Sequence, residues 1–201
     1  MEIKTEKVRA FFDGLADTWD RDRDPHADIL EDILDRADIV PGCRVLDVAC
    51  GTGVLFPWYL ARGAAAVTGV DLSPAMIRAA AAKYQDERLT LLAGDVEQLE
   101  LGLFDRIVVL NALPHFPDPG RLIARLAEHL VPGGRLTVAH DRPRPVIDGV
   151  HQQTASEVSR GMLPAQETAG LFAACLHVDT VIEDSRRYIV SGTATRYSQR
   201  S

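Results

Sequence analysis

The sequence of 201 residues contains only three cysteines, and no two of them form a C-x-x-C pair. An odd number of cysteines without that spacing disfavours both a disulfide framework and a zinc knuckle. The chain also lacks a charged-then-apolar leader and any apolar run close to the roughly 18 residues that span a bilayer. We therefore expect a protein of the reducing cytoplasm that is neither secreted nor inserted into a membrane.

Positive charge is scarce. The chain has 22 Lys and Arg against 29 Asp and Glu, which gives a formal net charge of −7. Nucleic-acid backbones and anionic membranes both favour clustered Lys and Arg, so neither is expected as the main partner. We expect a small-molecule partner, and the composition leaves the choice between monomer and homodimer open.

Hydrophobic residues make up 46% of the chain and charged residues 25%, which is enough to bury one sizeable core at this length. We expect one domain over residues 1–201. Residues 1–40 would form N-terminal helices, residues 43–140 the cofactor-binding core, and residues 141–201 substrate-side helices and a last hairpin.

Apolar residues in the segment 4–20 recur at helical spacing and predict an amphipathic helix. They are Val8, Phe11, Phe12, Leu15 and Trp19. A polar break at 21–25 separates this helix from a second one over 27–37, which Pro41-Gly42 ends. The first helix could close over a pocket as a lid or pack against the core, and the sequence leaves both open.

From Cys43 onward, short apolar runs alternate with helical segments, which predicts a parallel sheet covered on both faces. The expected strands are 44–48, 66–70, 89–92, 106–110 and 135–139. A loop through 141–145, a helix over 148–160 and a helix from Pro164 to Cys175 follow, and the runs 177–182 and 187–193 predict an antiparallel hairpin.

The stretch Val45-Leu46-Asp47-Val48-Ala49-Cys50-Gly51-Thr52-Gly53-Val54-Leu55 runs a buried strand into a glycine loop. Gly51 and Gly53 let the backbone approach a nucleotide closely. The dinucleotide pattern G-x-G-x-x-G needs a third glycine, where this chain has Phe56. The loop therefore favours an adenosyl compound over a ligand with a pyrophosphate.

Three acids end successive strands. Asp47, four residues before Gly51, would attract an α-ammonium, and Asp71, twenty residues after Gly51, occupies the position from which a carboxylate accepts ribose hydroxyls. Asp95 can accept a hydrogen bond from an exocyclic amine such as that of adenine. Each acid alone could simply cap the next helix. Together they describe S-adenosylmethionine.

With these motifs the sequence resembles the class I S-adenosylmethionine-dependent methyltransferases, most closely the small-molecule branch with the ubiquinone and menaquinone methyltransferases. The resemblance covers most of residues 8–140, and its motifs are 11–20, 45–55, 67–74, 93–99, 104–119 and 130–136. It implies a Rossmann-like, doubly wound, mostly parallel seven-stranded sheet in a three-layer α/β/α arrangement, with a C-terminal antiparallel hairpin. Ala49 departs from the glycine of many members.

The resemblance also implies how the cofactor S-adenosylmethionine is held. Asp47, Ala49, Gly51 and Gly53 would face its methionine end, Asp71 its ribose, and Asn111 its sulfonium. The adenine would be flanked by Leu72 and Met76 and met at its edge by Asp95 and Val96.

The acceptor is less constrained. The segment Asn111-Ala112-Leu113-Pro114 is not the Asn-Pro-Pro-aromatic signature that grips a planar amine, which disfavours methylation of nucleobase amines. A small acceptor with an oxygen, sulfur, nitrogen or carbon nucleophile remains. Two alternatives stay open: a non-catalytic protein that binds adenosyl compounds and, against the glycine pattern, an NAD(P)-dependent oxidoreductase.

Three histidines near the ends of the fourth and fifth strands are unexplained by the cofactor motifs: His115, His140 and His151. Neutral imidazoles can act as a general base, and three together could hold a divalent metal, although each could also be a wall residue. We expect them to converge on the acceptor pocket. Arg142 and Arg144 could add an anion-binding edge beside them, which favours an acidic acceptor.

Overall fold

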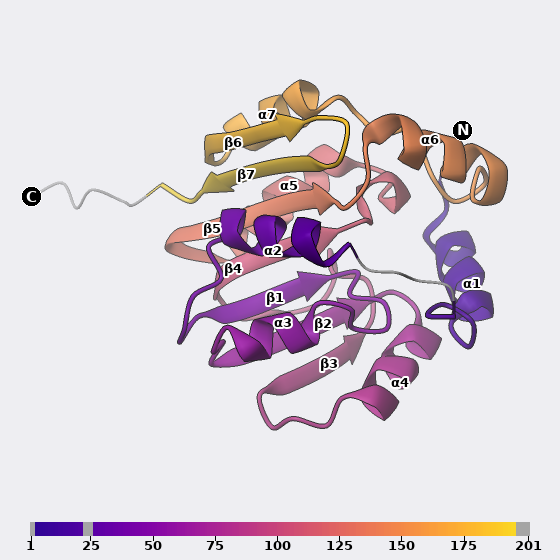
Figure 1. Cartoon of the computed structure of the whole chain (residues 1–201), viewed down its shortest axis with the longest axis horizontal. Helices are drawn as coiled ribbons and strands as arrows, with labels where there is room; N and C mark the ends of the chain where they lie inside the picture. The colour runs from indigo at the N-terminus through magenta and orange to yellow at the C-terminus, as the bar shows by residue number, and fades with distance from the viewer. Residues whose placement is uncertain (1–2, 22–25, 196–201) are drawn as a thin grey trace, which may run out of the picture.

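The computed structural model describes residues 3–21 and 26–195, and in this part of the chain seven strands form one sheet in the order β3-β2-β1-β4-β5-β7-β6 (Figure 1). The first five strands are parallel, whereas β7 runs antiparallel to both β5 and β6. The strands are β1 (Arg44–Val48), β2 (Ala66–Asp71), β3 (Leu89–Ala93), β4 (Phe104–Leu110), β5 (Leu130–His140), β6 (His177–Glu183) and β7 (Tyr188–Thr193). The expected fold class, including the final hairpin, is confirmed.

Helices cover both faces of the sheet. Figure 1 shows α2 and α3 on the face towards the viewer and α5 and α7 behind the sheet. The helices are α1 (Thr5–Leu15), α2 (Ala27–Arg36), α3 (Phe56–Ala61), α4 (Pro74–Lys83), α5 (Pro119–Glu128), α6 (Arg144–Thr154) and α7 (Ala165–Ala173), and Leu113–His115 form the short 3-10 helix η1. Among residues 3–21 and 26–195, no helix is both long enough and apolar enough to cross a membrane.

The alternation along β1 divides the core into two layers. Val45 belongs to the cluster that includes α2 and α3, and Leu46 and Val48 belong to the cluster that includes α5 and α7. All three side chains are 0% exposed. Full burial of such a side chain contributes roughly 1.5–3 kcal/mol, so this strand fixes the sheet at the point where the glycine loop begins.

Two helix boundaries differ from the prediction. Helix α1 ends at Leu15 instead of near residue 20, because the amide and the hydroxyl of Thr18 both donate to the carbonyl oxygen of Leu15, at 3.0 and 3.2 Å. The predicted helix 148–160 is instead α6, Arg144–Thr154. Pro143, with ψ 147°, precedes it and Pro145 lies in its first turn, where a missing N–H costs nothing. The polar break at 22–25 lies outside the described residues.

Helix α1 does not join either of these core layers. Its Val8, with Ile3, packs against Ala155 and Val158 in a third cluster, to which Phe11 and Phe12 are added. The helix lies at the edge where β1, β2 and β4 end (Figure 1). Whether α1 acts as a lid stays a prediction.

Candidate active site

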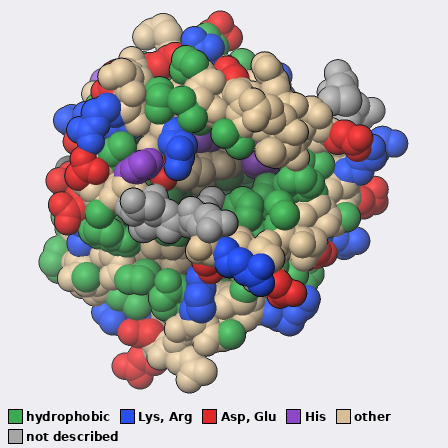
Figure 2. All heavy atoms as spheres, turned by 45° about the vertical axis from the view of Figure 1, so that its right-hand side comes forward, with side chains coloured by type: hydrophobic (Ala, Val, Ile, Leu, Met, Phe, Trp, Pro, Cys, Tyr) green, Lys and Arg blue, Asp and Glu red, His purple; other side chains and the backbone are tan. Residues whose placement is uncertain are grey.

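A cavity of about 650 Å³ opens at the carboxyl ends of the parallel strands, between the glycine loop, α1 and α6. Figure 2 shows this hollow in the surface of the molecule. Its volume falls within the roughly 300–1,000 Å³ of small-ligand pockets. In open parallel sheets this edge is where ligands bind.

The loop after β1 turns sharply under the cavity. Ala49 and Gly51 line the cavity with φ of 54° and 56°, in the left-handed region. Glycine adopts this conformation freely, whereas alanine pays about 1 kcal/mol or more for it. The strained Ala49 is held there by its surroundings, and it occupies the position where the resemblance expects glycine.

Asp47 lies at the end of β1 and lines the cavity at 2% exposure. No hydrogen bond or ion pair reaches its carboxylate from the described residues. Burial, and in second place the charge of Asp71, raises the pKa of Asp47 well above its ordinary value. A carboxyl group in this state is suited to a cationic ligand, because an ammonium group would repay the cost of ionising it.

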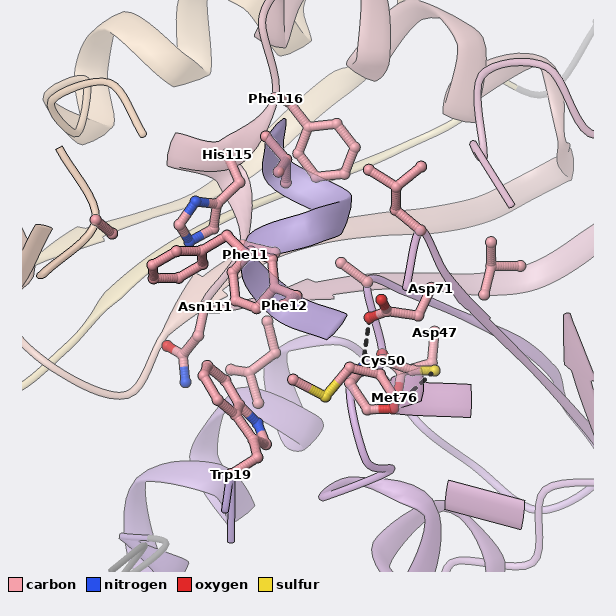
Figure 3. Close-up of a pocket in the computed structure, with 18 of the residues that line it drawn as sticks. Phe11, Phe12, Trp19, Asp47, Cys50, Asp71, Met76, Asn111, His115 and Phe116 are labelled. Carbon is pink, nitrogen blue, oxygen red and sulfur yellow. Dashed lines mark hydrogen bonds between the residues drawn. The ribbon is translucent and has the colours of Figure 1, made fainter. Parts of the chain in front are cut away.

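Asp71 holds the loop itself. Its two carboxylate oxygens accept hydrogen bonds from the backbone amides of Gly51 and Ser73, each at 2.8 Å. Figure 3 shows the bond to the glycine loop as a dashed line. Burial raises the pKa of Asp71, and the two amide donors oppose that rise. Each oxygen keeps a lone pair, so the side chain can accept ribose hydroxyls while it fixes the loop.

Gly53 does not line the cavity. A Cβ atom added there would lie 2.4 Å from the ring of Phe56, and one added at Gly69 would lie 2.6 Å from the same ring. Phe56 therefore occupies the space where a dinucleotide-binding loop has its third glycine. Gly53 therefore leaves room for the ring of Phe56 and allows the turn, with φ of 85°, and it does not contact a ligand in the cavity directly.

The side chains expected at the adenine all line the same cavity: Leu72, Met76, Asp95 and Val96. The carboxylate of Asp95 also accepts hydrogen bonds from the amide of Glu97 at 3.0 Å and from the side chain of Gln98 at 3.1 Å. Asp95 thus caps the turn, and its carboxylate oxygens keep lone pairs for a ligand. Asn111, with φ of 56°, accepts from the amide of Asp141 at 3.1 Å and ties the ends of β4 and β5 together.

A hydrogen-bond partner fixes which ring nitrogen of His115 carries the proton. Its Nδ1 lies 2.9 Å from the carbonyl oxygen of Val158, which can only accept, so in the neutral ring Nδ1 carries the proton. The lone pair is then on Nε2, for which no protein partner is found in the described residues, and the side chain lines the cavity. Burial lowers the pKa of His115 to about 4, the charge of His151 adds to this, and the Val158 carbonyl opposes it.

His140 and His151 meet His115 in the same cavity, as expected. The rings of His115 and His151 lie 4.9 Å apart, edge to face. Burial lowers the pKa of His140 to about 3 and also lowers that of His151. Nε2 of His140 and Nδ1 of His151 are buried and have no hydrogen-bond partner in the described part of the chain. The cluster is therefore neutral near pH 7.

The structure offers no support for a metal at these histidines. Within residues 3–21 and 26–195, no group of three or more His, Cys, Asp or Glu side chains is placed to hold a metal ion.

Aromatic rings form one continuous wall of the cavity. Phe12 contacts Phe11 at 5.2 Å, Trp19 at 5.6 Å and His115 at 4.9 Å, all edge to face. In Figure 3 these rings lie together, apart from Asp47 and Asp71. We call Phe11, Phe12, Trp19, His115 and His151 the ring wall.

Several pocket residues were not predicted from the sequence, among them Phe116, Ile147 and Val150. The carbonyl of Val158 has no sequence signal, because any residue carries one. A glycine inside a strand, such as Gly69, does mark a close approach of another group, and it could have pointed to the contact with Phe56.

The chain is similar to known proteins. Residues 45–134 match the family model of a methyltransferase domain. The ubiquinone biosynthesis O-methyltransferase of Xylella fastidiosa is 34% identical over 146 residues, which cover 69% of this chain and 58% of that protein. The methyltransferase GfsG of Streptomyces halstedii is 30% identical over 144 residues, which cover 69% of this chain and 49% of that protein. The chain thus spans about half the length of these curated relatives.

Among solved structures, the chain is similar to one from the complex between the Haloferax volcanii Trm112 methyltransferase activator and a methyltransferase, with a TM-score of 0.80 and 22% identity over 96% of this chain and 100% of that chain. Magnesium protoporphyrin IX methyltransferase from Synechocystis PCC 6803, solved with bound S-adenosylhomocysteine, has a TM-score of 0.70 and 20% identity, and the match covers 95% of this chain and 99% of that chain. At these identities the likeness concerns the fold.

Proposed function

Because the chain belongs to the class I S-adenosylmethionine-dependent methyltransferases, we propose that it transfers the methyl group of this cofactor to a small-molecule acceptor. The observation that carries the proposal is the division of the cavity. Asp47 and Asp71 line it beside the glycine loop, whereas Phe11, Phe12 and His115 lie together, apart from these two acids (Figure 3). One end suits the donor and the other an apolar acceptor.

The donor end fits S-adenosylmethionine on three points. Asp47 is a buried carboxyl group that lines the cavity and has no partner among the described residues. Asp71 has lone pairs left for a ribose diol, and the loop at Gly51 brings the backbone close without a Cβ atom in the way. A pyrophosphate would meet the carboxyl groups of Asp47 and Asp71, which makes an NAD(P)-dependent reaction the poorer fit.

When bound, the cofactor supplies an electrophilic methyl group, and its sulfur keeps the electron pair of the broken bond. The protein then has to align the acceptor and exclude water. The ring wall and α1 would exclude water, and Asn111 holds the ends of β4 and β5 in register. For an acceptor that must lose a proton, Nε2 of His115 is the best-placed base, because Val158 fixes its tautomer.

Calorimetry with S-adenosylhomocysteine tests the donor site, and release of that product in the presence of acceptors tests turnover. At a hundredfold excess over the Kd, binding should stabilise the fold by about 2.7 kcal/mol. Asp71→Asn should weaken binding by roughly 1.5–3 kcal/mol, because the diol loses its charged acceptor. Equal binding by wild type and Asp71→Asn would show the site assignment to be wrong.

The same measurements separate an enzyme from a non-catalytic binding protein. A protein that binds S-adenosylhomocysteine but releases none with any acceptor from a panel of phenols, thiols, amines and carbon acids would support the second function.

A further inference from the structure

Two arginines flank the start of α6, and the structure gives them different roles. Nε of Arg144 lies 2.6 Å from Oε1 of Glu183, and its guanidinium also lies 3.9 Å from Asp148. Arg142 is exposed and lines the cavity, and it makes no hydrogen bond or ion pair with the described residues. Of the two, only Arg142 is available to a ligand.

Arg142 is also the one Lys or Arg among the described residues that line the cavity. The acids there are Asp47, Asp71, Asp95, Glu97 and Asp141. The first four lie at or just after the ends of β1, β2 and β3, so the donor end is acidic. A negatively charged ligand group would be repelled from that end, and among the described lining residues Arg142 is the cation that could pair with it.

Two of the three cavity histidines lie near this arginine in the sequence. His140 precedes it by two residues, and His151 lies on α6, which begins two residues after it. All three side chains line the cavity. Among the described residues, the acceptor end of the cavity therefore combines neutral imidazoles with one exposed, unpaired cation.

The shape of the acceptor end is set by the ring wall and by Phe116, Ile147 and Val150. These side chains offer ring faces, ring edges and methyl groups to a ligand. A flat, conjugated body buries the largest apolar area against such surfaces and gains from stacked or edge contacts.

We propose that the acceptor is a hydroxylated aromatic carboxylic acid, whose ring packs against the ring wall, whose carboxylate pairs with Arg142, and whose hydroxyl oxygen receives the methyl group. This proposal rests on the proposed function and names its substrate class. The hydroxyl proton passes to Nε2 of His115, the oxygen–methyl bond forms as the methyl–sulfur bond breaks, and the products are a methyl ether, S-adenosylhomocysteine and an imidazolium that returns its proton to water.

The acceptor's charge would also assist the base. An anion near the histidines favours their protonated form, whereas burial alone disfavours it. The carboxylate at Arg142 would therefore make His115 a stronger base when the acceptor is bound than in the free protein. A neutral acceptor of the same shape would lack this effect.

The test compares protocatechuate with its neutral amide. Each is titrated by calorimetry into protein saturated with S-adenosylhomocysteine, and each is offered as an acceptor with the methyl donor. We expect the acid to bind at least tenfold more tightly than the amide in the wild type, since a charge-assisted bond contributes about 1.5–3 kcal/mol. Arg142→Gln should reduce that preference to less than about twofold, and Arg142→Lys should keep part of it.

Arg36→Gln removes an exposed arginine on α2, outside the cavity, and should leave the preference unchanged. Equal binding of acid and amide to the wild type, or no binding of protocatechuate at all, would overturn the proposal, as would an equal loss for both ligands in Arg142→Gln. Intact binding of S-adenosylhomocysteine in these cases leaves the proposed function standing, whereas its absence removes that function.

Discussion

Oδ1 of Asp13 accepts a hydrogen bond from Oγ of Ser73 at 2.6 Å, across 60 residues of sequence. The same hydroxyl accepts from the amide of Met76 at the start of α4. A second carboxylate, that of Asp20, accepts from Thr52 in the glycine loop and from Lys83, both at 2.7 Å. The N-terminal segment is thus bonded to two elements that line the donor end.

We predict that Asp13→Ala raises the KM of the acceptor severalfold and leaves the cooperativity of unfolding unchanged, because it frees α1 without touching the sheet. The hydrogen bond from Ser73 lowers the pKa of Asp13, so this contact is present above its ordinary value of 3.8 and is lost as the pH falls. Steady-state kinetics and thermal unfolding check both parts. Asp17→Ala, at an exposed position beside α1, is the control.

Removal of residues 1–20 extends this prediction. Turnover should fall strongly while unfolding stays cooperative, because the apolar residues of α1 pack in their own cluster. A truncated chain that does not fold would instead place Phe11, Phe12 and Trp19 in the core.

Cofactor binding should release a proton from Asp47. The raised pKa means that free protein keeps this carboxyl protonated above its ordinary value of 3.8, and an ammonium group beside it would bring the pKa down. Affinity for S-adenosylhomocysteine should therefore rise with pH between the pKa of the complex and that of the free protein. Calorimetry in buffers of different ionisation enthalpy measures the released proton. Asp47→Asn should show none, and an equal release from this variant would assign the proton to another group.

The neutral histidines should make the free energy of unfolding depend on pH in the acid range. His140 and His115 have pKa values of about 3 and about 4, below the 6.5 of an unfolded histidine. Between the folded pKa values and 6.5 the unfolded chain binds more protons than the folded chain, so the free energy of unfolding rises with pH. This contribution to stability is fully present above pH 6.5 and is lost as the pH falls. Each histidine contributes up to about 1.4 kcal/mol per pH unit in its window. His140→Gln should flatten the stability curve, whereas His177→Gln, at an exposed position on β6, should not.

In catalysis we expect a separate effect of the cluster. His115→Ala, His140→Ala and His151→Ala should each lower turnover at least tenfold, about 1.4 kcal/mol of barrier, with little change in affinity for S-adenosylhomocysteine. Wild-type rates in all three variants would remove the proton-transfer role.

Gly53→Ala should destabilise the fold by more than about 1 kcal/mol, because the new Cβ would lie 2.4 Å from Phe56 at a residue with positive φ. Gly149→Ala in α6 is the matched control. It meets nothing within 4 Å and should stabilise the protein by roughly 0.5–1 kcal/mol through helix propensity. Denaturant unfolding compares the two, and a neutral Gly53→Ala would show that the ring of Phe56 can move.

The sequence predicted the sheet well because buried parallel strands are continuous apolar runs, and β1 was placed residue for residue. It misplaced the start of α6, since Arg142 to Pro145 has the composition of a loop although prolines also begin helices. The meeting of the three histidines was predictable from strand ends. The difference between Arg142 and Arg144 was not, because Glu183 is 39 residues away from Arg144.

The contact of Phe56 with Gly53 and Gly69 has a consequence for how this protein can diverge. One ring fills the space above both glycines, so a side chain at either position requires a smaller residue at 56. Across an evolving lineage we expect these three sites to change together and in a fixed order, with the ring reduced first. Substitution of a glycine before that step would create a clash with the ring, and the lineage would pass through a destabilised intermediate.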